Sequence, residues 1–530
     1  MYRPVRKIVI VGGGTAGWLT AGIVASHYNM GSEIGPDYKE SGSERLEIVL
    51  VESPDVATIG VGEGTWPSMR TTLQQMGISE TDFIQQCDVS LKQGSRFDNW
   101  VTGASDYYYH PFSLPQGFGE TNLVRHWQRV RDKVSFADAV CQQGQLCDRG
   151  LAAKQISTPE YAFNVNYGYH LDAGKFATFL QRHCIEKLGV KHLLDHVTGV
   201  SSRPNGDIDA VETKLSGPIN GDLFIDCTGF AAILIGQHYD VPFRSVSDVL
   251  YNDTALAMQV PYNNENDPIA SHTLATAQSA GWIWNIGLPT RRGIGHVYSS
   301  RYISDENAER ELRDYVEPIV GRRQAEELSL RKIPIKPGYR AEFWHRNCVA
   351  VGLSAGFVEP LEASALVLVE YSAKMIAQQL PENRDLMSIT AKRFNAKFSY
   401  HWAQIIDFLK LHYLLNQQHD DAYWQANRNK ESVPESLQDA VMLWRHRPPW
   451  VEDAPLIDEL FSSASFQYVL YGMGFVTKES PISQRNAIVA EAKINRLFSD
   501  NLNKTTQLLN AQPSNRELIN KINEFGLQKI

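Results

Sequence analysis

Three glycines near the start of the chain have the spacing of a phosphate-binding turn. They are Gly12, Gly14 and Gly17, and a mostly β-branched apolar run over residues 8–11 comes directly before them. The first glycine permits a tight turn, the second lets backbone N–H groups approach a pyrophosphate, and the third lets a helix lie against the strand. Helix-forming residues 19–25 follow, so the pyrophosphate would meet the positive end of a helix. The stretch predicts a dinucleotide site.

An acidic residue ends the second expected strand. Residues 46–51 form a strand-like, mostly apolar run that ends at Glu52. Dinucleotide folds hydrogen-bond the ribose hydroxyls from this position. The spacing from the glycines exceeds the usual ~20 residues because a polar, glycine-rich insertion covers residues 29–44. An acid here suits an unphosphorylated ribose, as in FAD or NAD. The alternative is that Glu52 is only a solvated strand end.

Two further stretches carry reactive or aromatic side chains. Residues 107–112, Tyr-Tyr-Tyr-His-Pro-Phe, suit either core packing or the stacking of a flat aromatic substrate. Lys92, taken alone, has nothing in its periodicity to distinguish it from a solvated lysine. Cys141 and Cys147 could form a redox or metal pair, but no second pair stands near them. We therefore expect reduced core thiols at Cys87, Cys141, Cys147, Cys184, Cys227 and Cys348.

Composition limits the class of protein. The chain has 530 residues, of which 43% are hydrophobic and 21% charged, which suits a globular protein with two or three packed regions. A formal net charge of −9 argues against a nucleic-acid scaffold. No apolar run approaches the ~20 residues of a membrane span, and residues 1–7 lead directly into the first strand without a secretory segment. We therefore expect a cytoplasmic protein.

The elements that must hold the dinucleotide alternate between strands and helices. Residues 59–67 form a second glycine-rich turn. A helix is expected between positions 168 and 189, and its apolar face would consist of Leu171, Phe176, Phe179 and Leu180. Residues 222–230 resemble the buried strand, ending in an acid and a Thr-Gly turn, that closes the FAD domain of flavoproteins. Large apolar residues alternate from 249 to 302, which is typical of a sheet with one buried face. From residue 365 onward the pattern is helical.

The sequence thus predicts an α/β fold with a Rossmann-like FAD-binding domain. We place this domain, with its interleaved β-sheet, over residues 1–380. A mainly helical region over residues 381–530 follows and completes the substrate site. The helical region is also the candidate interface if the protein forms a homodimer.

Several motifs together resemble the flavin-dependent halogenases of the tryptophan-halogenase type. The glycine motif is followed by Trp18, and Gly281-Trp282-x-Trp284-x-Ile286 is similar to the family motif GWxWxIP, with Gly287 in place of the proline. The resemblance covers most of the first 380 residues. It extends through Val61-Gly62-Glu63, Tyr298-Ser299-Ser300-Arg301 and Phe357-Val358-Glu359-Pro360-Leu361-Glu362.

The resemblance implies an oxidative halogenation. In this family a separate NAD(P)H-dependent flavin reductase supplies reduced FAD, and FADH2, O2 and chloride or bromide together give hypohalous acid. That acid moves through an internal tunnel to an aromatic substrate. Trp282 and Trp284 would lie near the flavin and the tunnel, where the family's tryptophans are taken to discourage direct hydroxylation.

The resemblance also assigns the catalytic residues. Ser90-Leu91-Lys92 precedes Phe97-Asp98-Asn99-Trp100, so the family lysine falls on Lys92, which would hydrogen-bond hypohalous acid or carry the halogen as a haloamine. The family glutamate falls on Glu362, which would stabilise the cationic ring, accept its proton or orient the hypohalous acid. Backbone amides of Ser364 and Ala365 would bind halide. FAD contacts are expected from Gly12, Gly14, Thr15, Ala16, Gly17, Glu52, Ile59, Val61, Glu63, Val197, Leu353 and Leu366.

Departures from the family concern the substrate. His110 and Phe112 match the family's indole-stacking His-x-Phe, and Phe461 would stand where a tryptophan completes the sandwich. The Tyr-Tyr pair and the glutamate that hold the amino-acid backbone of tryptophan have no clear match in residues 448–453. A site that lacks those hydrogen bonds does not select free tryptophan. We therefore expect an indole-like or other electron-rich aromatic.

Two other functions stay open at this point. On the same fold a flavin monooxygenase could hydroxylate an aromatic or reduce a polyprenyl chain, although a one-component hydroxylase must also bind NAD(P)H and the chain has one fingerprint. A non-catalytic flavin-binding protein could sense redox state or an aromatic signal. Lys92, Glu362 and the tryptophan pair favour halogenation.

Overall fold

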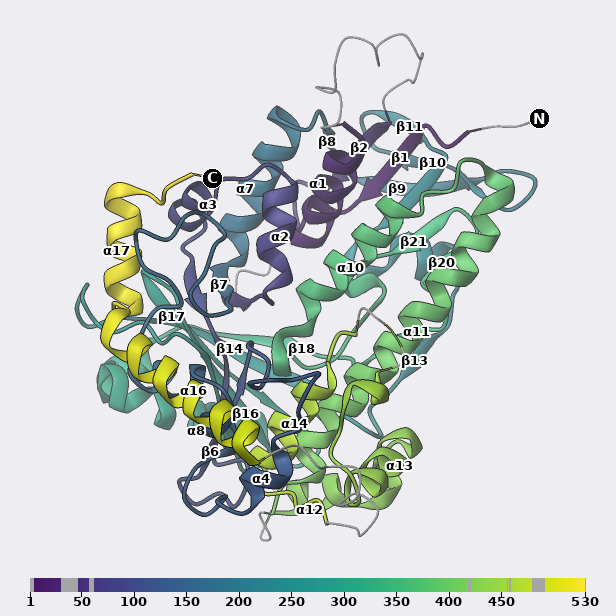
Figure 1. Ribbon diagram of the computed structural model, residues 1–530. Helices are drawn as coiled ribbons and strands as arrows, with labels where there is room; N and C mark the ends of the chain where they lie inside the picture. Colours follow the sequence, from purple (N-terminus) through teal and green to yellow (C-terminus); the bar gives the residue numbers. More distant parts are fainter. Residues whose placement is uncertain are drawn as a thin grey trace. The chain divides into compact units, whose positions relative to one another are not determined.

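The chain forms two compact units, each assembled from three separate stretches. The computed structural model describes residues 4–29, 46–56, 62–417, 421–454, 456, 459–478 and 491–529 (Figure 1). Unit 1 comprises Met1–Asp88, Leu171–Val246 and Lys336–Tyr400, and unit 2 comprises Val89–His170, Ser247–Ile335 and His401–Ile530. The sequence predicts that the FAD-binding domain ends at residue 380, and this boundary stays a prediction.

The centre of unit 1 is a six-stranded sheet in the order β20-β21-β12-β1-β2-β8. β1 pairs in parallel with β2 and with β12, so the N-terminal strand lies in the middle. Strands buried on both faces are nearly continuous apolar runs, which is why the run over residues 8–11 is recognisable. The strands are β1 (Lys7–Val11), β2 (Glu47–Glu52), β8 (Lys191–Leu194), β12 (Leu223–Asp226), β20 (Trp344–His345) and β21 (Cys348–Ala350).

Helices cover this sheet and two small sheets complete unit 1. α1 packs against α7 and α10. The expected helix between positions 168 and 189 is α7, but Leu171, expected on its apolar face, belongs to the preceding strand β7 (Gly168–Asp172). The described part of the second glycine turn is extended as β3 (Gly62–Gly64).

The remaining strands are β9 (Val197–Ser202), β10 (Ile208–Thr213), β11 (Gly217–Asn220), β13 (Phe243–Ser245), β19 (Gly338–Arg340) and β22 (Gly356–Phe357). The helices are α1 (Thr15–Asn29), α2 (Ser68–Gln75), α3 (Glu80–Gln86), α7 (Ala173–Glu186), η3 (Gly229–Ala231), η4 (Ile233–His238), η5 (Gly352–Ser354), η6 (Leu361–Ala363), α10 (Ser364–Gln378) and the first part of α11 (Arg384–Leu414).

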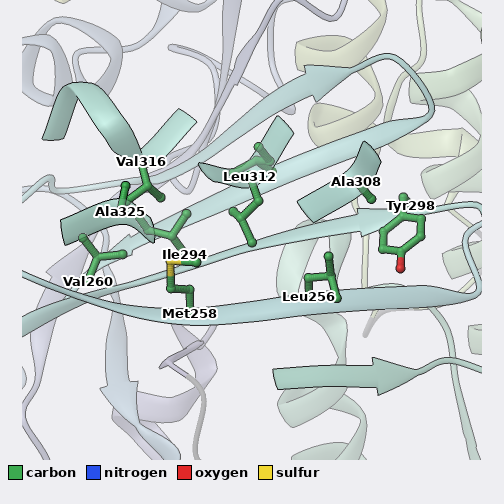
Figure 2. Close-up of a cluster of buried hydrophobic side chains, with 10 residues drawn as sticks. Leu256, Met258, Val260, Ile294, Tyr298, Ala308, Leu312, Val316 and Ala325 are labelled. Atoms are coloured by element: carbon green, nitrogen blue, oxygen red, sulfur yellow. The ribbon is translucent and has the colours of Figure 1, made fainter. Parts of the chain in front are cut away.

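Unit 2 is built on a seven-stranded sheet in the order β18-β14-β17-β16-β15-β5-β6. Figure 2 shows the core between α8 and this sheet, where Leu256 and Ile294 meet Leu312. Each fully buried side chain of this size stabilises the fold by roughly 1.5–3 kcal/mol. The strands are β4 (Ser90–Lys92), β5 (Gly94–Asp98), β6 (Tyr107–Pro111), β14 (Thr254–Pro261), β15 (Thr273–Gln278), β16 (Gly281–Gly287), β17 (Arg291–Tyr298) and β18 (Leu330–Pro334).

The C-terminal region is helical, as the sequence predicts. Every described element from residue 381 onward is a helix, and this confirms the predicted α/β class with a mainly helical end. Among the described residues, no helix combines the length and the apolar character that crossing a bilayer requires. The helices of unit 2 are α4 (Val124–Gln128), α5 (Phe136–Val140), α6 (Gln143–Asp148), α8 (Asp305–Val320), α9 (Arg322–Glu327), the second part of α11, α12 (Ala422–Arg428), η7 (Lys430–Ser432), α13 (Glu435–Trp444), η8 (Val451–Asp453), α14 (Ser463–Gly472), α16 (Glu491–Ala511) and α17 (Asn515–Phe525).

Candidate active site

The three glycines line a cradle at the end of β1. Gly12 has φ +113°, and a Cβ atom there would lie 2.2 Å from the carbonyl oxygen of Cys227. A Cβ atom on Gly17 would lie 1.9 Å from the Gly12 oxygen, whereas one on Gly14 would meet nothing within 4 Å. Two of the glycines are therefore required by close packing, and Gly14 faces open space. α1 begins directly beyond, at Thr15, so its first N–H groups and its positive end border that space.

Glu52 lies at the mouth of this cradle. It is the last residue of β2, and a Cβ atom on Gly13 would lie 2.1 Å from the Glu52 side chain. His192 Nε2 lies 2.9 Å and Gln181 Nε2 lies 3.2 Å from the same carboxylate oxygen, Oε2. These contacts orient the carboxylate beside the glycine turn. Open space over Gly14, a helix N-terminus and an oriented carboxylate fit the pyrophosphate and ribose of FAD.

The other expected FAD contacts lie on several elements of unit 1. Thr15 and Ala16 open α1, and a Cβ atom on Gly352 would lie 2.8 Å from the Ala16 Cβ. The structure therefore brings η5, which contains Leu353, next to the start of α1. Leu366 is in the first turn of α10, Val197 begins β9 and Glu63 is in β3. Ile59 and Val61 lie outside the described residues.

Glu63 carries a perturbed carboxyl group. Burial, and to a smaller extent the nearby carboxylate of Asp172, together raise its pKa from 4.5 to about 7. A carboxyl group with a pKa near neutrality exists partly in its protonated form, which can donate a hydrogen bond. Glu63 is therefore a titratable group among the expected FAD contacts.

Glu362 stands on a strained turn. It has φ +65° and ψ 6°, and the next residue, Ala363, has φ +55° and ψ 45°. Non-glycine residues in this left-handed region cost about 1–3 kcal/mol each and persist only when surrounding contacts fix them. The indole N–H of Trp66 donates to the Glu362 carbonyl oxygen at 2.8 Å. Glu362 is only 7% exposed, so its carboxylate is largely removed from bulk water.

The expected halide site coincides with a helix N-terminus. α10 begins at Ser364, and Ala365 is its second residue. The first four N–H groups of a helix have no partner within the helix, and the helix dipole favours an anion there. The amides of Ser364 and Ala365 can therefore bind an anion whatever their side chains are.

Lys92 is buried in unit 2. It ends β4, which pairs with residues 168–170, and it is 1% exposed. Its ammonium nitrogen lies 5.2 Å from the centre of the Phe112 ring. Burying an ammonium group is costly, so this lysine departs from the solvated lysine that its sequence context alone suggests. Burial and the charge of Lys92 lower the pKa of His170 well below its ordinary value, which keeps that imidazole neutral.

Two of the three aromatic residues expected to hold substrate, His110 and Phe112, come from the same segment of unit 2. His110 belongs to β6, and its ring lies 5.5 Å from Phe408 and 6.1 Å from Tyr468, centroid to centroid. The Phe112 N–H donates to the Gln93 carbonyl at 3.0 Å. The Phe112 carbonyl accepts from the Asn166 side chain at 2.9 Å. Phe112, the ring beside Lys92, is therefore fixed through both of its backbone groups.

The paired tryptophans lie on β16, in the middle of the unit 2 sheet. Trp282 and Trp284 are both buried, and their ring centroids are 6.4 Å apart. Trp284 faces Gly295 across the strand pair, and a Cβ atom on Gly295 would lie 2.2 Å from the indole. A glycine at this position therefore provides the space that the Trp284 ring occupies.

Comparison with known proteins settles the family. Residues 7–487 match the tryptophan halogenase family. The chain belongs to this family. It is therefore a flavin-dependent halogenase, as the motifs predict, and FAD and a halide are the reagents that the family implies.

Similar proteins cover the whole chain. The crystal structure of a tryptophan halogenase from Shewanella frigidimarina is 50% identical, covers 100% of this chain and 99% of its own, and has a TM-score of 0.93. Tryptophan 6-halogenase SttH from Streptomyces toxytricini is 32% identical over 89% of this chain and 90% of its own. BrvH, a flavin-dependent halogenase from Brevundimonas sp. BAL3, is 30% identical, covers 98% of this chain and 99% of its own, and has a TM-score of 0.83.

Two residues of the halogenase that sequence reasoning missed hold Phe461. The Phe408 ring of α11 stacks on the Phe461 ring at 3.8 Å between centroids and 18° between planes. One turn earlier, the Gln404 side chain accepts from the N–H groups of Leu460 and Phe461 at 3.2 and 3.4 Å and donates to the Phe461 carbonyl at 3.3 Å. Residues 404 and 408 are four positions apart, so they lie on one face of a helix. This spacing is the sequence signal that could have pointed to them.

The thiol groups of the halogenase have no proposed role in the chemistry. All six are buried free thiols, as the sequence predicts. Burial raises the pKa of Cys141 to about 11, and burial also raises the pKa of Cys147 above its ordinary value. Within the described ranges, no group of three or more metal-binding side chains occurs.

Proposed function

We propose that Lys92 and Glu362 are the catalytic pair of this halogenase, acting on an electron-rich aromatic of the indole class. Support comes from Lys92, whose ammonium is buried against Phe112 on a regular strand. Burial of this cation beside a ring expected to hold substrate favours a role in the chemistry. The family lysine and this buried lysine are the same residue.

The residues divide the chemistry among them. The glycine cradle and Glu52 bind and orient FAD, which when reduced and exposed to O2 supplies the oxidation of halide to hypohalous acid. Amides of Ser364 and Ala365 hold the halide. Lys92 either hydrogen-bonds the oxygen of hypohalous acid, polarising the bond that breaks, or carries the halogen on its amine.

Glu362 completes the substitution on the ring. A ring carbon attacks the halogen, the carbon–halogen bond forms and the oxygen–halogen bond breaks. When Lys92 hydrogen-bonds hypohalous acid, its ammonium gives a proton to the departing hydroxide, which leaves as water. The carboxylate of Glu362 stabilises the resulting cation and accepts the proton that the ring carbon loses. Reduced FAD comes from a separate NAD(P)H-dependent reductase, because the chain carries one dinucleotide fingerprint.

The substrate is proposed to be an aromatic other than free tryptophan. Asp453 belongs to the segment 448–453, and Arg447, which directly precedes this segment, donates to both of its carboxylate oxygens at 2.5 and 2.9 Å. The Trp450 N–H also donates to Asp453 at 2.8 Å. Because these contacts occupy Asp453 internally, it does not replace the glutamate that holds the amino-acid backbone of tryptophan. A site without such partners loses selectivity for that substrate.

A coupled assay tests this proposal. Purified protein, FAD, a flavin reductase, NADH and bromide or chloride are incubated with indole and tryptophan in parallel, and products are followed by mass spectrometry. We expect halogenated indole that disappears in Lys92→Ala, with tryptophan unchanged. Halogenated tryptophan would overturn the substrate assignment. A hydroxylated product, formed equally by the variant, would instead establish a monooxygenase.

A further inference from the structure

The carbonyl group of Glu362 has a dedicated hydrogen-bond donor. Trp66 lies immediately before α2, is half-buried, and donates its indole N–H to this oxygen at 2.8 Å. The peptide unit that the bond holds joins the two left-handed residues Glu362 and Ala363. Rotation of that unit would move the Glu362 side chain and the first amides of α10 together, because all of them are attached to the same turn.

The helix that follows Trp66, α2, is bonded to α10, the helix that follows this turn. Two hydroxyls of α2, those of Ser68 and Thr72, donate to the carboxylate of Glu370 on α10, the first at 3.0 Å. Glu370 is fully buried. The segment 66–72 therefore reaches the turn at one point and the helix at two points, so the indole is held in a fixed position relative to Ser364.

We propose that Trp66 is a positioning residue for the Glu362 carboxylate and for the halide-binding amides of Ser364 and Ala365. This inference rests on the proposed roles of those three residues. The indole touches none of the reacting atoms. The Ala363 N–H of the same peptide unit donates to the Pro360 carbonyl at 2.9 Å, and the Trp66 bond fixes the other side of that unit, so the strained turn presents both groups.

The molecule contains a matched control for this contact. In the same unit, the Trp344 indole N–H donates to the carbonyl of Arg346 at 3.1 Å, and Arg346 is also a non-glycine residue in the left-handed region, with φ +53°. Trp66→Phe and Trp344→Phe therefore remove the same kind of bond from the same kind of turn. Only the first turn carries a proposed catalytic residue.

The test measures halide binding without turnover. The melting temperature of each purified variant is followed against bromide, with acetate added to keep the ionic strength constant, and FAD affinity is measured by flavin fluorescence. Losing one neutral hydrogen bond should raise the half-saturating bromide concentration about 5–10-fold in Trp66→Phe. We expect no such rise in Trp344→Phe, and FAD affinity within about twofold of wild type in both variants, since neither bond touches the cradle.

A second variant separates positioning from general loss of structure. Glycine adopts the left-handed conformation without strain, so Ala363→Gly in the Trp66→Phe background should recover part of the bromide affinity. Bromide affinity that is equal in Trp66→Phe and wild type overturns the inference, as does an equal loss in Trp344→Phe. Wild-type protein that neither responds to bromide nor halogenates indole overturns the proposed function, and the inference with it.

Discussion

The two proposed catalytic side chains are held in opposite ways. Lys92 ends a regular strand in unit 2, where paired backbone hydrogen bonds fix it and no unusual dihedral is needed. Glu362 stands in unit 1 on two consecutive left-handed residues, and its carbonyl is held by the Trp66 indole. The lysine is positioned by secondary structure, whereas the turn of the glutamate is held by a tertiary bond from Trp66 and a local bond from the Ala363 N–H to the Pro360 carbonyl. Perturbing a neighbour should therefore affect the glutamate more than the lysine.

Removing the ammonium should have the largest effect. Lys92→Met keeps a long, apolar side-chain stem and removes the ammonium group. We expect the rate of indole halogenation to fall about 10²–10⁴-fold, the range for a positioned proton donor or nucleophile. Lys154 is the control, because it too is buried, and its ammonium lies 5.6 Å from the Tyr167 ring. Lys154→Met should lower the melting temperature while rates in the folded fraction stay near wild type. Equal loss of rate in both variants would remove the catalytic role of Lys92.

Removing the carboxylate should have the next largest effect. In Glu362→Gln the group can no longer accept a proton, and we expect a loss of about 10²-fold or more in product formation at saturating bromide. Asp207→Asn is the comparison, since this buried carboxylate of unit 1 receives two bonds from Arg384, at 2.6 and 2.8 Å, and has no proposed role in the chemistry. It should reduce stability more than rate. A Glu362→Gln enzyme with a normal rate would show that its carboxylate takes no part in the chemistry.

A smaller effect is expected where the substrate ring would lie. Gln404→Ala removes three hydrogen bonds from residues 460 and 461, so Phe461 loses its fixed position on Phe408. We expect KM for indole to rise about 5–10-fold, with kcat within about twofold. Gln438→Ala also removes a glutamine that binds backbone carbonyls, those of Lys430 and Val433, and should leave KM unchanged. A change in kcat alone would contradict a role for Gln404 in substrate binding.

The smallest effect concerns stability against pH. Because the pKa of Glu63 is raised from 4.5 to about 7, the folded protein keeps a proton over that window which the unfolded chain has lost. The free energy of unfolding therefore falls as the pH rises from about 4.5 to 7. Glu63→Gln removes this fall, so its melting temperature relative to wild type should be higher at pH 8 than at pH 5. A constant offset for Glu63→Gln would contradict the raised pKa.

Local sequence patterns predicted many of the strands and helices, but they could not predict contacts between residues that are distant in the sequence. The run 8–11 and the glycines after it are recognisable because a buried strand and a tight turn each leave a short signal. Leu171 was misplaced because β7 and α7 adjoin, and an apolar residue at their junction fits either period. The hydrogen bond between Trp66 and Glu362 joins residues that are 296 positions apart, and no sequence pattern predicts it.

The site residues show the same difference between local sequence signals and long-range contacts. Lys92 was assigned through a family resemblance, and its burial became visible only in the structure, because burial depends on strands distant in sequence. Gln404 and Phe408 have helical spacing, but nothing in the sequence indicates which segment that helix face meets. The comparison of a strand-held lysine with a turn-held glutamate thus required the tertiary structure.

One measurement tests the division of labour most directly. Free hypohalous acid, trapped by a diffusible thioether scavenger, and halogenated indole are quantified together in wild type and in Lys92→Met, with reductase, FAD and bromide in excess. We predict that Lys92→Met still forms hypohalous acid at a rate near wild type while halogenated indole falls at least about 10²-fold. Equal loss of both products, or halogenated indole at the wild-type level, would contradict the proposed role of Lys92 in transferring the halogen.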